Sequence, residues 1–326
     1  MKTINLIAPA KVNLYLGIGE RQEDGYHNAL TVMHALSMHD GVRMTHVGAG
    51  EHVTLLEPCD AAQPLREVKV DVDAGSGLQV EATVIWREGI EPLDIPSQDN
   101  LACKAVHALA QELGREEDEC IRLVIEKHIP HQTGLGGGSA DAAAALLGAA
   151  HLWGIPANHE AVAHVAQQLG ADVRFFLHGG CMLLQGRGDE PVATLAPRRD
   201  SVVIIRPEGG VSTAEAYRTF DESPVYPEPA QLEAVRAATE ATQVPLFNNL
   251  EAPAQKLLPE LAEIAQFASQ APGVTDVLLC GSGSGTFAVC ESHQAAAALS
   301  SAAQVKGYWT RTTSFSPVRA ALLPQR

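Results

Sequence analysis

The chain has 326 residues, of which 46% are hydrophobic, so it is long enough for one large domain or two ordinary ones. Its 39 acidic and 23 basic side chains give a formal net charge of −16 at pH 7, which argues against a general nucleic-acid binder because it repels a phosphate backbone. A small anionic ligand is still compatible with this charge, since a local cluster of backbone amides and one Lys can outweigh the field of the whole molecule.

The cysteines and the apolar segments indicate a soluble cytoplasmic protein. The six cysteines form no CxxC pair and have no His at zinc-site spacing, so we expect reduced, mostly buried thiols and no disulfide framework. They are Cys59, Cys103, Cys120, Cys181, Cys280 and Cys290. Polar residues interrupt the first sixteen positions, which therefore lack a signal-peptide core. The longest uncharged helical run, at 142–158, falls short of the ~20 apolar residues that a membrane span needs.

The first predicted element is a strand. In KVNLYLGI, at 11–18, apolar residues occupy every second position, which is the period of a half-buried strand. By the same parity Lys11, Asn13 and Tyr15 share the opposite face of that strand. A glycine turn, EDGYH at 23–27, follows it.

Residues 41–96 carry mixed signals. Short alternating runs such as GLQVEATVIW indicate strands, whereas EPCDAAQPLRE and GIEPLDIPSQ read as loops. A helix is then expected to begin at Asp99, with an apolar face that reaches Leu113 and with Gly114 at its C-cap. IRLVIEKHIP alternates as a strand up to Pro130.

The later part of the chain predicts a second unit. A helix over 158–169 and a hairpin turning at 186–189 precede APRRDS, at 196–201, which marks the predicted domain boundary. We therefore divide the chain into 1–197 and 198–326. Beyond the boundary the order is strand, helices, strand, tight glycine turn, strand, helix, strand. This order, with an inserted helical segment, matches a ferredoxin-like split βαβ unit.

The stretch IPHQTGLGGGSADAAAALLG, at 129–148, places a glycine cluster between a strand and an alanine-rich helix. Its glycines let the backbone adopt positive φ and approach a ligand with no Cβ in the way. The helix that starts near Ser139 points unpaired N–H groups and the positive end of its dipole into the same space. No Lys follows the last glycine, so the stretch is not a Walker A loop. A flexible turn before a well-capped helix is the alternative, but the flanking strand and helix favour a phosphate-binding loop.

Three segments together resemble the motifs of the GHMP kinases, the superfamily of galactokinase, homoserine kinase and mevalonate kinase. They are APAKVNLYLGIGERQEDGYHNALTVM, IPHQTGLGGGSADAAAALLGAAHLWG and VLLCGSGSGTFAV. The combination of PAKVNL with DGYH, then LGADVRFF and GRGDEP, is similar to members of the superfamily that act on a cytidyl-diphosphate substrate in isoprenoid precursor biosynthesis. The similarity covers most of the chain except roughly 45–95, where family members are shorter.

The resemblance implies an α+β, two-domain GHMP-kinase-like fold. An N-terminal ribosomal-protein-S5-like α/β domain, at 1–197, is expected to carry the ATP-phosphate loop and the catalytic pair. A C-terminal ferredoxin-like split βαβ domain, at 198–326, is expected to complete the substrate cleft. The implied activity is a kinase that transfers the γ-phosphate of ATP, with Mg²⁺, to a tertiary hydroxyl of a small cytidyl-diphosphate molecule. ATP and that molecule are the expected partners, with no nucleic acid and no membrane, for a monomer or a weak homodimer.

The same resemblance assigns the reacting groups and the ATP loop. Lys11 and Asp172 match the catalytic pair, in which Asp172 would accept the hydroxyl proton while Lys11 offsets negative charge. The segment 130–140 matches the ATP-phosphate loop, with binding residues Pro130, Gly134, Leu135, Gly136, Gly137, Gly138, Ser139 and Ala140. Mg²⁺ is expected to be held mainly by the ATP phosphates, with Ser139 and water, since no carboxylate cluster in the sequence marks a dedicated metal site.

On the substrate side, Asn13, Tyr26 and His27 match family positions near the substrate, the last two beside the cytosine ring. An aromatic ring and an imidazole with two hydrogen-bonding nitrogens suit a flat base. Tyr217 falls in the region of a second aromatic residue near that base.

Each assignment has an ordinary structural alternative. Asp172 could cap the turn that follows a helix end, and Lys11 could be a solvated residue that opens an edge strand. Asp141, beside the loop, is a rival base or metal ligand, although an acidic residue is also favoured in a first helical turn. The two residues of the glycine turn could pack on the surface, and Tyr217 could be an apolar contact on a short helix.

Three positions depart from the family pattern. Arg174 stands where Pro is usual and could change the electrostatics of Asp172. Cys280 stands where Thr or Ser is common before the glycines of the third motif, and NNLE at 248–251 replaces NDLE. None of these departures removes a catalytic group.

Two other functions stay open. Another GHMP kinase, of the homoserine or mevalonate type, is the nearer alternative, and the DGYH turn is the feature against it. A non-catalytic member of the fold that binds a nucleotide or metabolite is the other. The presence of both Lys11 and Asp172 argues against that reading.

Overall fold

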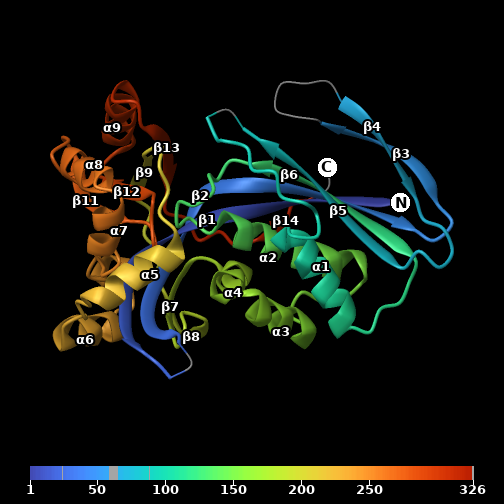
Figure 1. Ribbon diagram of the computed structural model, residues 1–326, viewed down its shortest axis with the longest axis horizontal. Coiled ribbons are helices and arrows are strands. Elements are labelled where there is room, and N and C mark those ends of the chain that lie inside the picture. Colours follow the sequence, from blue (N-terminus) through green and yellow to red (C-terminus); the bar gives the residue numbers. More distant parts are fainter. Residues whose placement is uncertain (24, 59–64, 88, 325–326) are drawn as a thin grey trace.

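Two long antiparallel strands, β1 (Lys2–Arg21) and β2 (His27–Gly48), form the centre of an eight-stranded sheet. The structure is a computed structural model, and it describes residues 1–23, 25–58, 65–87 and 89–324 (Figure 1). The other strands of this sheet are β5 (Leu78–Trp86), β6 (Glu119–Lys127), β7 (Cys181–Gln185), β8 (Glu190–Leu195), β10 (Phe247–Asn248) and β14 (Ala321–Leu322). β2 pairs with β6 near its end and with β7 near its start, so the sheet forks along β2.

Four helices cover one face of this sheet, as Figure 1 shows. They are α1 (Leu101–Glu112), α2 (Gly137–Leu152), α3 (Glu160–Leu169) and α4 (Ala171–His178). α2 lies against β1 and β2, and its alanines from Ala140 to Ala150 are buried. A Cβ built on Gly148 would lie only 2.2 Å from the sulfur of Met44, so small residues let this helix approach the sheet closely. The alanine run therefore lets α2 pack tightly against the sheet behind the glycine loop.

A separate two-stranded hairpin, β3 (His52–Pro58) and β4 (Leu65–Asp71), packs on β2 and β6, on the side of the sheet away from the helices (Figure 1). The segment EPCDAAQPLRE, at 57–67, is predicted to be a loop, but the structure places its first two and last three residues in these strands. Its middle part, 59–64, lies outside the described residues. Alternating valines and leucines bury one side of the hairpin against Val47 and Cys120. GIEPLDIPSQ, at 89–98, has no helix or strand, which confirms the prediction of a loop there.

The second sheet has four strands in the order β11–β12–β9–β13, all antiparallel. They are β9 (Ser201–Arg206), β11 (Val274–Leu279), β12 (Thr286–Cys290) and β13 (Trp309–Ser314). α8 (Glu260–Ser269) and α9 (His293–Val305) pack on it, and this order confirms the ferredoxin-like unit. The inserted segment holds α5 (Thr213–Glu222), α6 (Pro229–Ala237), the short 3₁₀ helix η1 (Ala241–Gln243) and α7 (Glu251–Leu257).

The chain returns twice to the first sheet after the predicted boundary at 196–201. β10 pairs in parallel with β1 at Tyr15 and Leu16, and β14 pairs with β1 near its start. Residues from both halves of the chain are therefore brought to β1. The division into 1–197 and 198–326 stays a prediction.

Several smaller predictions are confirmed with shifted boundaries. The helix expected at Asp99 begins at Leu101, where the side chain of Asn100 caps the Ala102 N–H. The helix expected near Ser139 begins at Gly137, and the hairpin of β7 and β8 turns at 186–189 as predicted.

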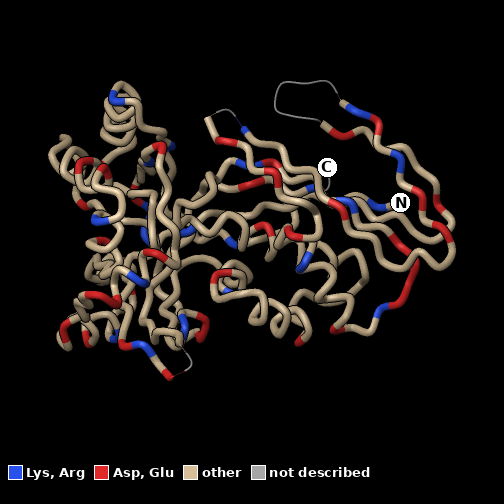
Figure 2. Tube along the Cα trace, in the orientation of Figure 1, with Lys and Arg blue, Asp and Glu red and all other residues tan. Residues whose placement is uncertain are grey.

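The described residues also show the state of the cysteines, the length of the helices and the distribution of charge. The five cysteines other than Cys59, which lies outside the described residues, are buried free thiols. No helix within the described ranges is long and apolar enough to cross a membrane. Figure 2 shows Asp and Glu spread over both halves of the molecule, with Lys and Arg interspersed among them.

Candidate functional site

The glycine loop runs from the end of β6 to the first turn of α2, and its glycines differ in what surrounds them. Gly134 and Gly136 have φ of 74° and 75°, which favours glycine at both positions. A Cβ on Gly134 would lie 1.9 Å from the carbonyl oxygen of Cys280, and one on Gly137 would lie 3.0 Å from Ile129. A Cβ on Gly138 would meet nothing within 4 Å. Gly134 and Gly137 therefore allow the chain to pack on itself, whereas Gly138 faces open space.

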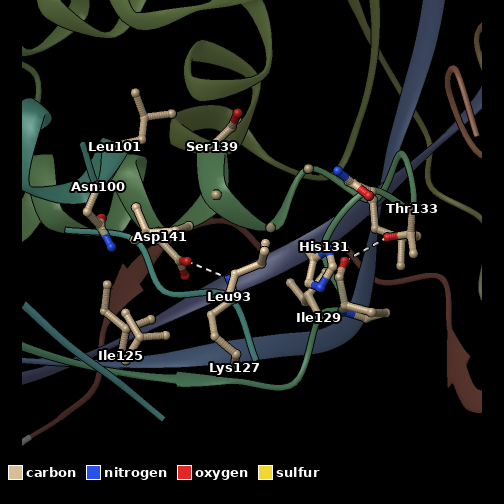
Figure 3. Close-up of a pocket in the computed structure, with 18 of the residues that line it drawn as sticks. Leu93, Asn100, Leu101, Ile125, Lys127, Ile129, His131, Thr133, Ser139 and Asp141 are labelled. Carbon is tan, nitrogen blue, oxygen red and sulfur yellow. Dashed lines mark hydrogen bonds and ion pairs between the residues drawn. The ribbon is translucent and has the colours of Figure 1, made fainter. Parts of the chain in front are cut away.

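A cavity of about 390 Å³ lies beside this loop (Figure 3). One wall is the loop itself, from Pro130 to Ser139. The other wall is largely apolar and comprises Val84, Trp86, Leu93, Ile95, Leu101 and Ile125. Leu93 and Ile95 follow β5 within 41–96, a stretch with mixed sequence signals, so no pattern marked them as site residues.

A buried charge cluster holds the start of the loop. Lys127 Nζ lies 2.6 Å from Asp141 Oδ2 and also pairs with Asp40 (Figure 3 draws the first pair). Asp40 Oδ1 accepts the backbone N–H groups of His128 and Ile129, at 2.5 and 2.8 Å. Burial, reinforced by Asp40 and opposed by Lys127, raises the pKa of Asp141 to about 7. Asp141 is therefore engaged in holding the loop to α2, and sequence reasoning missed its two partners.

Lys11 and Asp172 lie together beside the loop. Lys11 Nζ is 3.5 Å from Asp172 Oδ2, and the side chains are 6% and 29% exposed. The Lys11 ammonium also donates to Asn13 Oδ1 at 2.8 Å, and the Asn13 amide donates to Thr31 Oγ at 2.9 Å. The backbone N–H of Lys11 donates to the Leu135 carbonyl at 3.0 Å, at a register shift between β1 and β2. Lys11 is therefore anchored to the loop by its backbone and to Asn13 and Asp172 by its side chain.

Asp172 occupies the first turn of α4. This helix begins directly after Gly170, whose φ of 144° allows the chain to turn between α3 and α4. An acidic residue is favoured at this position because the positive end of the helix dipole lies at a helix start. The side chain of Arg174 donates to the carbonyl of Asp189, at 3.2 Å, in the turn between β7 and β8. This bond directs the guanidinium toward that turn.

The third motif, GSGSG at 281–285, supports the loop from the second half of the chain. The backbone N–H groups of Ser284 and Gly285 donate to the carbonyls of Gln132 and Thr133, at 3.0 and 3.2 Å. Burial raises the pKa of the Cys280 thiol to about 12, so this residue is an inert neutral group in the core. The motif therefore braces the loop with its backbone.

The NNLE departure has a structural explanation. Asn249 Oδ1 accepts the Ile18 N–H at 2.9 Å, and its amide nitrogen donates to the carbonyls of Ile18 and Val225, at 2.8 and 3.1 Å. A carboxylate at this position could not donate to either carbonyl. Asn249 thus ties the second half of the chain to β1 at Ile18.

The DGYH turn joins β1 to β2, and Asp24 within it lies outside the described residues. The ring of His27 lies 5.5 Å from that of Tyr217, on α5. Burial, with the nearby charge of Asp172, raises the pKa of Tyr217 to about 12. Tyr26 is 57% exposed, and the guanidinium of Arg187 lies 4.0 Å from the centre of its ring. The structure therefore brings His27, Tyr217 and Asp172 into one region, as the resemblance implies.

Comparison with known proteins gives matches over both halves of the chain. The family model of the GHMP kinases N terminal domain matches residues 100–180, and that of the GHMP kinases C terminal matches residues 231–308. A 4-diphosphocytidyl-2-C-methyl-D-erythritol kinase of Desulfitobacterium hafniense is 33% identical, over 90% of this chain and 89% of its own length. A kinase of the same name from Nocardia farcinica is 33% identical, over 92% of this chain and 88% of its own length.

Solved structures of kinases also match this chain over nearly its whole length. A crystal structure of 4-(cytidine 5'-diphospho)-2C-methyl-D-erythritol kinase covers 96% of this chain and 100% of its own, with a TM-score of 0.66 and 28% identity. A homoserine kinase from Cytophaga hutchinsonii covers 99% of this chain and 98% of its own, with a TM-score of 0.67 but only 17% identity. At that identity the second likeness concerns the fold alone.

Proposed function

The chain belongs to the 4-diphosphocytidyl-2-C-methyl-D-erythritol kinases of the GHMP family, and from this premise we propose that it phosphorylates 4-diphosphocytidyl-2-C-methyl-D-erythritol at its 2-hydroxyl. ATP supplies the γ-phosphate. The reaction contributes to isoprenoid precursor biosynthesis. The observation that carries the proposal is the Lys11–Asp172 pair, 3.5 Å apart and bonded through the Lys11 backbone to the glycine loop.

Phosphoryl transfer needs alignment of the reactants, neutralisation of charge and removal of a proton from the acceptor hydroxyl. Asp172 is 29% exposed and can reach a ligand, so its carboxylate takes that proton. Lys11 is nearly buried and is fixed by Asn13, so its ammonium stays beside the Asp172 carboxylate and offsets charge on the transferring group. The proton leaves the hydroxyl as its oxygen attacks the γ-phosphorus, and ADP is released.

The nucleotide fits the cavity beside the loop. The first turn of α2 offers free backbone N–H groups and the positive end of the helix dipole to the phosphates. Gly138 has open space where its side chain would be, which leaves room for a phosphate group. The apolar wall that includes Leu93 and Ile95 suits a flat purine.

Mg²⁺ bound with ATP would neutralise phosphate charge during transfer. Within the ranges that the structure describes, no group of three or more His, Cys, Asp or Glu side chains could hold a metal ion. The Ser139 hydroxyl lines the cavity at the first turn of α2 and fits a contact to such an ion. We therefore propose that the nucleotide phosphates supply most of the metal's ligands, with Ser139 as the contribution of the chain.

The acceptor lies on the other side of the Lys11–Asp172 pair. Asn13 is bonded to Lys11, and Tyr217 contacts the ring of His27 and lies near the charge of Asp172. The exposed ring of Tyr26 offers a face on which a cytosine could stack. These residues would hold the cytidyl group while its linked hydroxyl reaches Asp172.

An ADP-release assay with three acceptors tests this proposal. We expect turnover with 4-diphosphocytidyl-2-C-methyl-D-erythritol and none above background with homoserine or mevalonate. Turnover with one of the latter would select another GHMP kinase activity, and ATP binding without turnover would select a non-catalytic role. Action in the cytoplasm and a monomeric or weakly dimeric state stay predictions.

A further inference from the structure

Both ring nitrogens of His27 are engaged by the protein itself. The Nδ1 atom lies 2.9 Å from the carbonyl oxygen of Gly19, and Nε2 lies 3.1 Å from Asp221 Oδ1. Only 7% of the His27 side chain is exposed. Both partners are hydrogen-bond acceptors, so each can receive a hydrogen from the ring nitrogen that faces it. The ring is therefore fixed from two directions, by β1 and by α5.

One face of α5 encloses this ring. Tyr217, Phe220 and Asp221 stand at positions i, i+3 and i+4, which lie on the same side of a helix. The ring of Phe220 meets that of His27 edge-on, at 5.9 Å, next to the tilted contact with Tyr217. α5 belongs to the second half of the chain and His27 to the first, so these contacts join the two halves at the acceptor side.

The second oxygen of Asp221 extends the same link. Asp221 Oδ2 lies 3.7 Å from Arg21 Nη1, and the Arg21 Nε donates to the Gly25 carbonyl at 3.2 Å. Arg21 ends β1 and His27 begins β2, so one carboxylate contacts both ends of the turn. A substitution of Asp221 would release the turn from α5 at two points.

We propose that Asp221 is a positioning residue for the acceptor: it fixes the His27 ring and sets the spacing between Tyr217 and the turn that carries Tyr26. This inference rests on the proposed function, which places the cytidyl group between these elements. Asp221 acts through His27 and Arg21, so its loss weakens acceptor binding and leaves the Lys11–Asp172 pair in place. Binding to a preorganised site is stronger because the protein loses less conformational freedom when the ligand enters.

Steady-state kinetics of Asp221→Ala test the inference. We expect the KM for the cytidyl acceptor to rise about tenfold, with the KM for ATP unchanged and kcat within about twofold, since a charged hydrogen bond is lost on the acceptor side only. Asp221→Asn keeps an oxygen that can accept from Nε2, so it should restore most of the affinity. Glu222→Ala is the matched control, because this neighbour on α5 forms an exposed 2.8 Å pair with Lys256 and should leave every constant unchanged.

An NMR measurement on the ligand-free protein tests this inference without depending on the proposed function. The Nε2–H resonance of His27 should appear in ¹⁵N-edited spectra of the wild type and disappear in Asp221→Ala, whatever the acceptor is. An unchanged resonance would overturn the inference, as would an unchanged acceptor KM or an equal rise in both KM values. A wild type that shows the resonance but does not phosphorylate the cytidyl acceptor would refute the proposed function and leave the positioning of His27 by Asp221 standing.

Discussion

The two sides of the proposed active site are held in different ways. On the nucleotide side, residues 130–140, most of the contacts that hold the loop involve its backbone. Backbone N–H groups of the 281–285 turn donate to the loop carbonyls, and the buried Asp40 carboxylate accepts backbone N–H groups at the start of the loop. On the acceptor side, the β1–β2 turn and α5, side chains make the main contacts. His27 pairs with Asp221, and Arg187 lies over the exposed Tyr26.

From this difference we can predict which ligand's affinity a single substitution should change. A loop held by several buried backbone bonds keeps its shape when one exposed side chain is lost, because most of its bonds do not involve side chains. A site held by partly exposed side chains loses geometry with each of them. Changes on the acceptor side should therefore alter acceptor affinity without affecting the nucleotide, and Lys11 and Asp172 lie where the two sides meet.

The largest effect is expected where the sides meet. Asp172→Asn keeps the shape of the side chain but cannot accept a proton, so kcat should fall by ~10²–10⁴, the usual contribution of a positioned general base. Single-turnover transfer, measured with both substrates saturating, gives this value. Affinity for ATP should change little, because Asp172 does not line the nucleotide cavity.

Two acidic residues serve as controls for that experiment. Glu160→Gln alters an exposed carboxylate in the first turn of α3 and should leave kcat unchanged. Asp141→Asn alters the buried partner of Lys127 and should act mainly on loop stability. An active Asp172→Asn beside an Asp141→Asn that binds ATP but does not turn over would move the base to the glycine loop.

A second substitution addresses the nucleotide side alone. Gly138→Val places a branched side chain in open space at the second position of α2, where a phosphate is proposed to lie. We expect ATP affinity to fall about a hundredfold, as one lost phosphate contact and the added bulk together would produce. Gln294→Val, at the second position of α9, is the matched control. Normal ATP affinity in Gly138→Val, with an unchanged circular dichroism spectrum, would mean that the loop is only structural.

On the acceptor side, His27→Ala should raise the KM for the cytidyl acceptor about tenfold, since it removes the ring that links the turn to α5. The KM for ATP should stay constant. Combining this change with Asp221→Ala should give less than the product of the two single effects, because both act through one contact. A multiplicative double variant would show that the two residues work separately.

The smallest effect on activity is expected for His34, a residue at the junction between the sheets whose predicted effect is on stability. His34 is fully buried, its Nδ1–H donates to the Ala35 carbonyl, and its Nε2 accepts the Arg198 N–H at 2.9 Å. Burial lowers the pKa of His34 from 6.5 to about 4. Below pH 6.5 the unfolded chain binds a proton that the folded chain takes up only near pH 4. The free energy of unfolding should therefore fall by about 3 kcal/mol through this window.

Urea unfolding of the wild type and of His34→Gln, at about pH 7 and about pH 5, checks this sign. The variant should be less stable at the higher pH and should lose less stability on acidification. Equal losses in both proteins would assign the acid sensitivity to other groups. Turnover of the wild type at neutral pH is not expected to depend on His34, which lies away from the cavity.

The nucleotide side was largely predictable from the sequence, because its parts are close along the chain. Strand, glycines and alanine helix lie within 119–152, and the pattern alone predicts their order. The pairing of Lys11 with Asp172 came from the family resemblance, since the two lie on separate elements. Their separation of 3.5 Å supports that assignment.

The acceptor side was less predictable for a physical reason. Asp221 and Phe220 contact His27 only because the chain, after the predicted boundary, comes back to β1 through β10. Helical periodicity places Phe220 and Asp221 near the face of Tyr217, but no local pattern shows what that face meets. Leu93 could not be predicted to line the cavity either, because a loop without regular structure carries no periodic signal.

One calorimetric series tests the central claim that the two sides bind independently. A non-hydrolysable ATP analogue is titrated into the wild type, Gly138→Val, His27→Ala and Asp221→Ala. We expect a large loss of affinity in Gly138→Val and wild-type affinity in the other two variants. Loss of affinity for the analogue in His27→Ala, comparable with that in Gly138→Val, would contradict it and would place the β1–β2 turn in the nucleotide site.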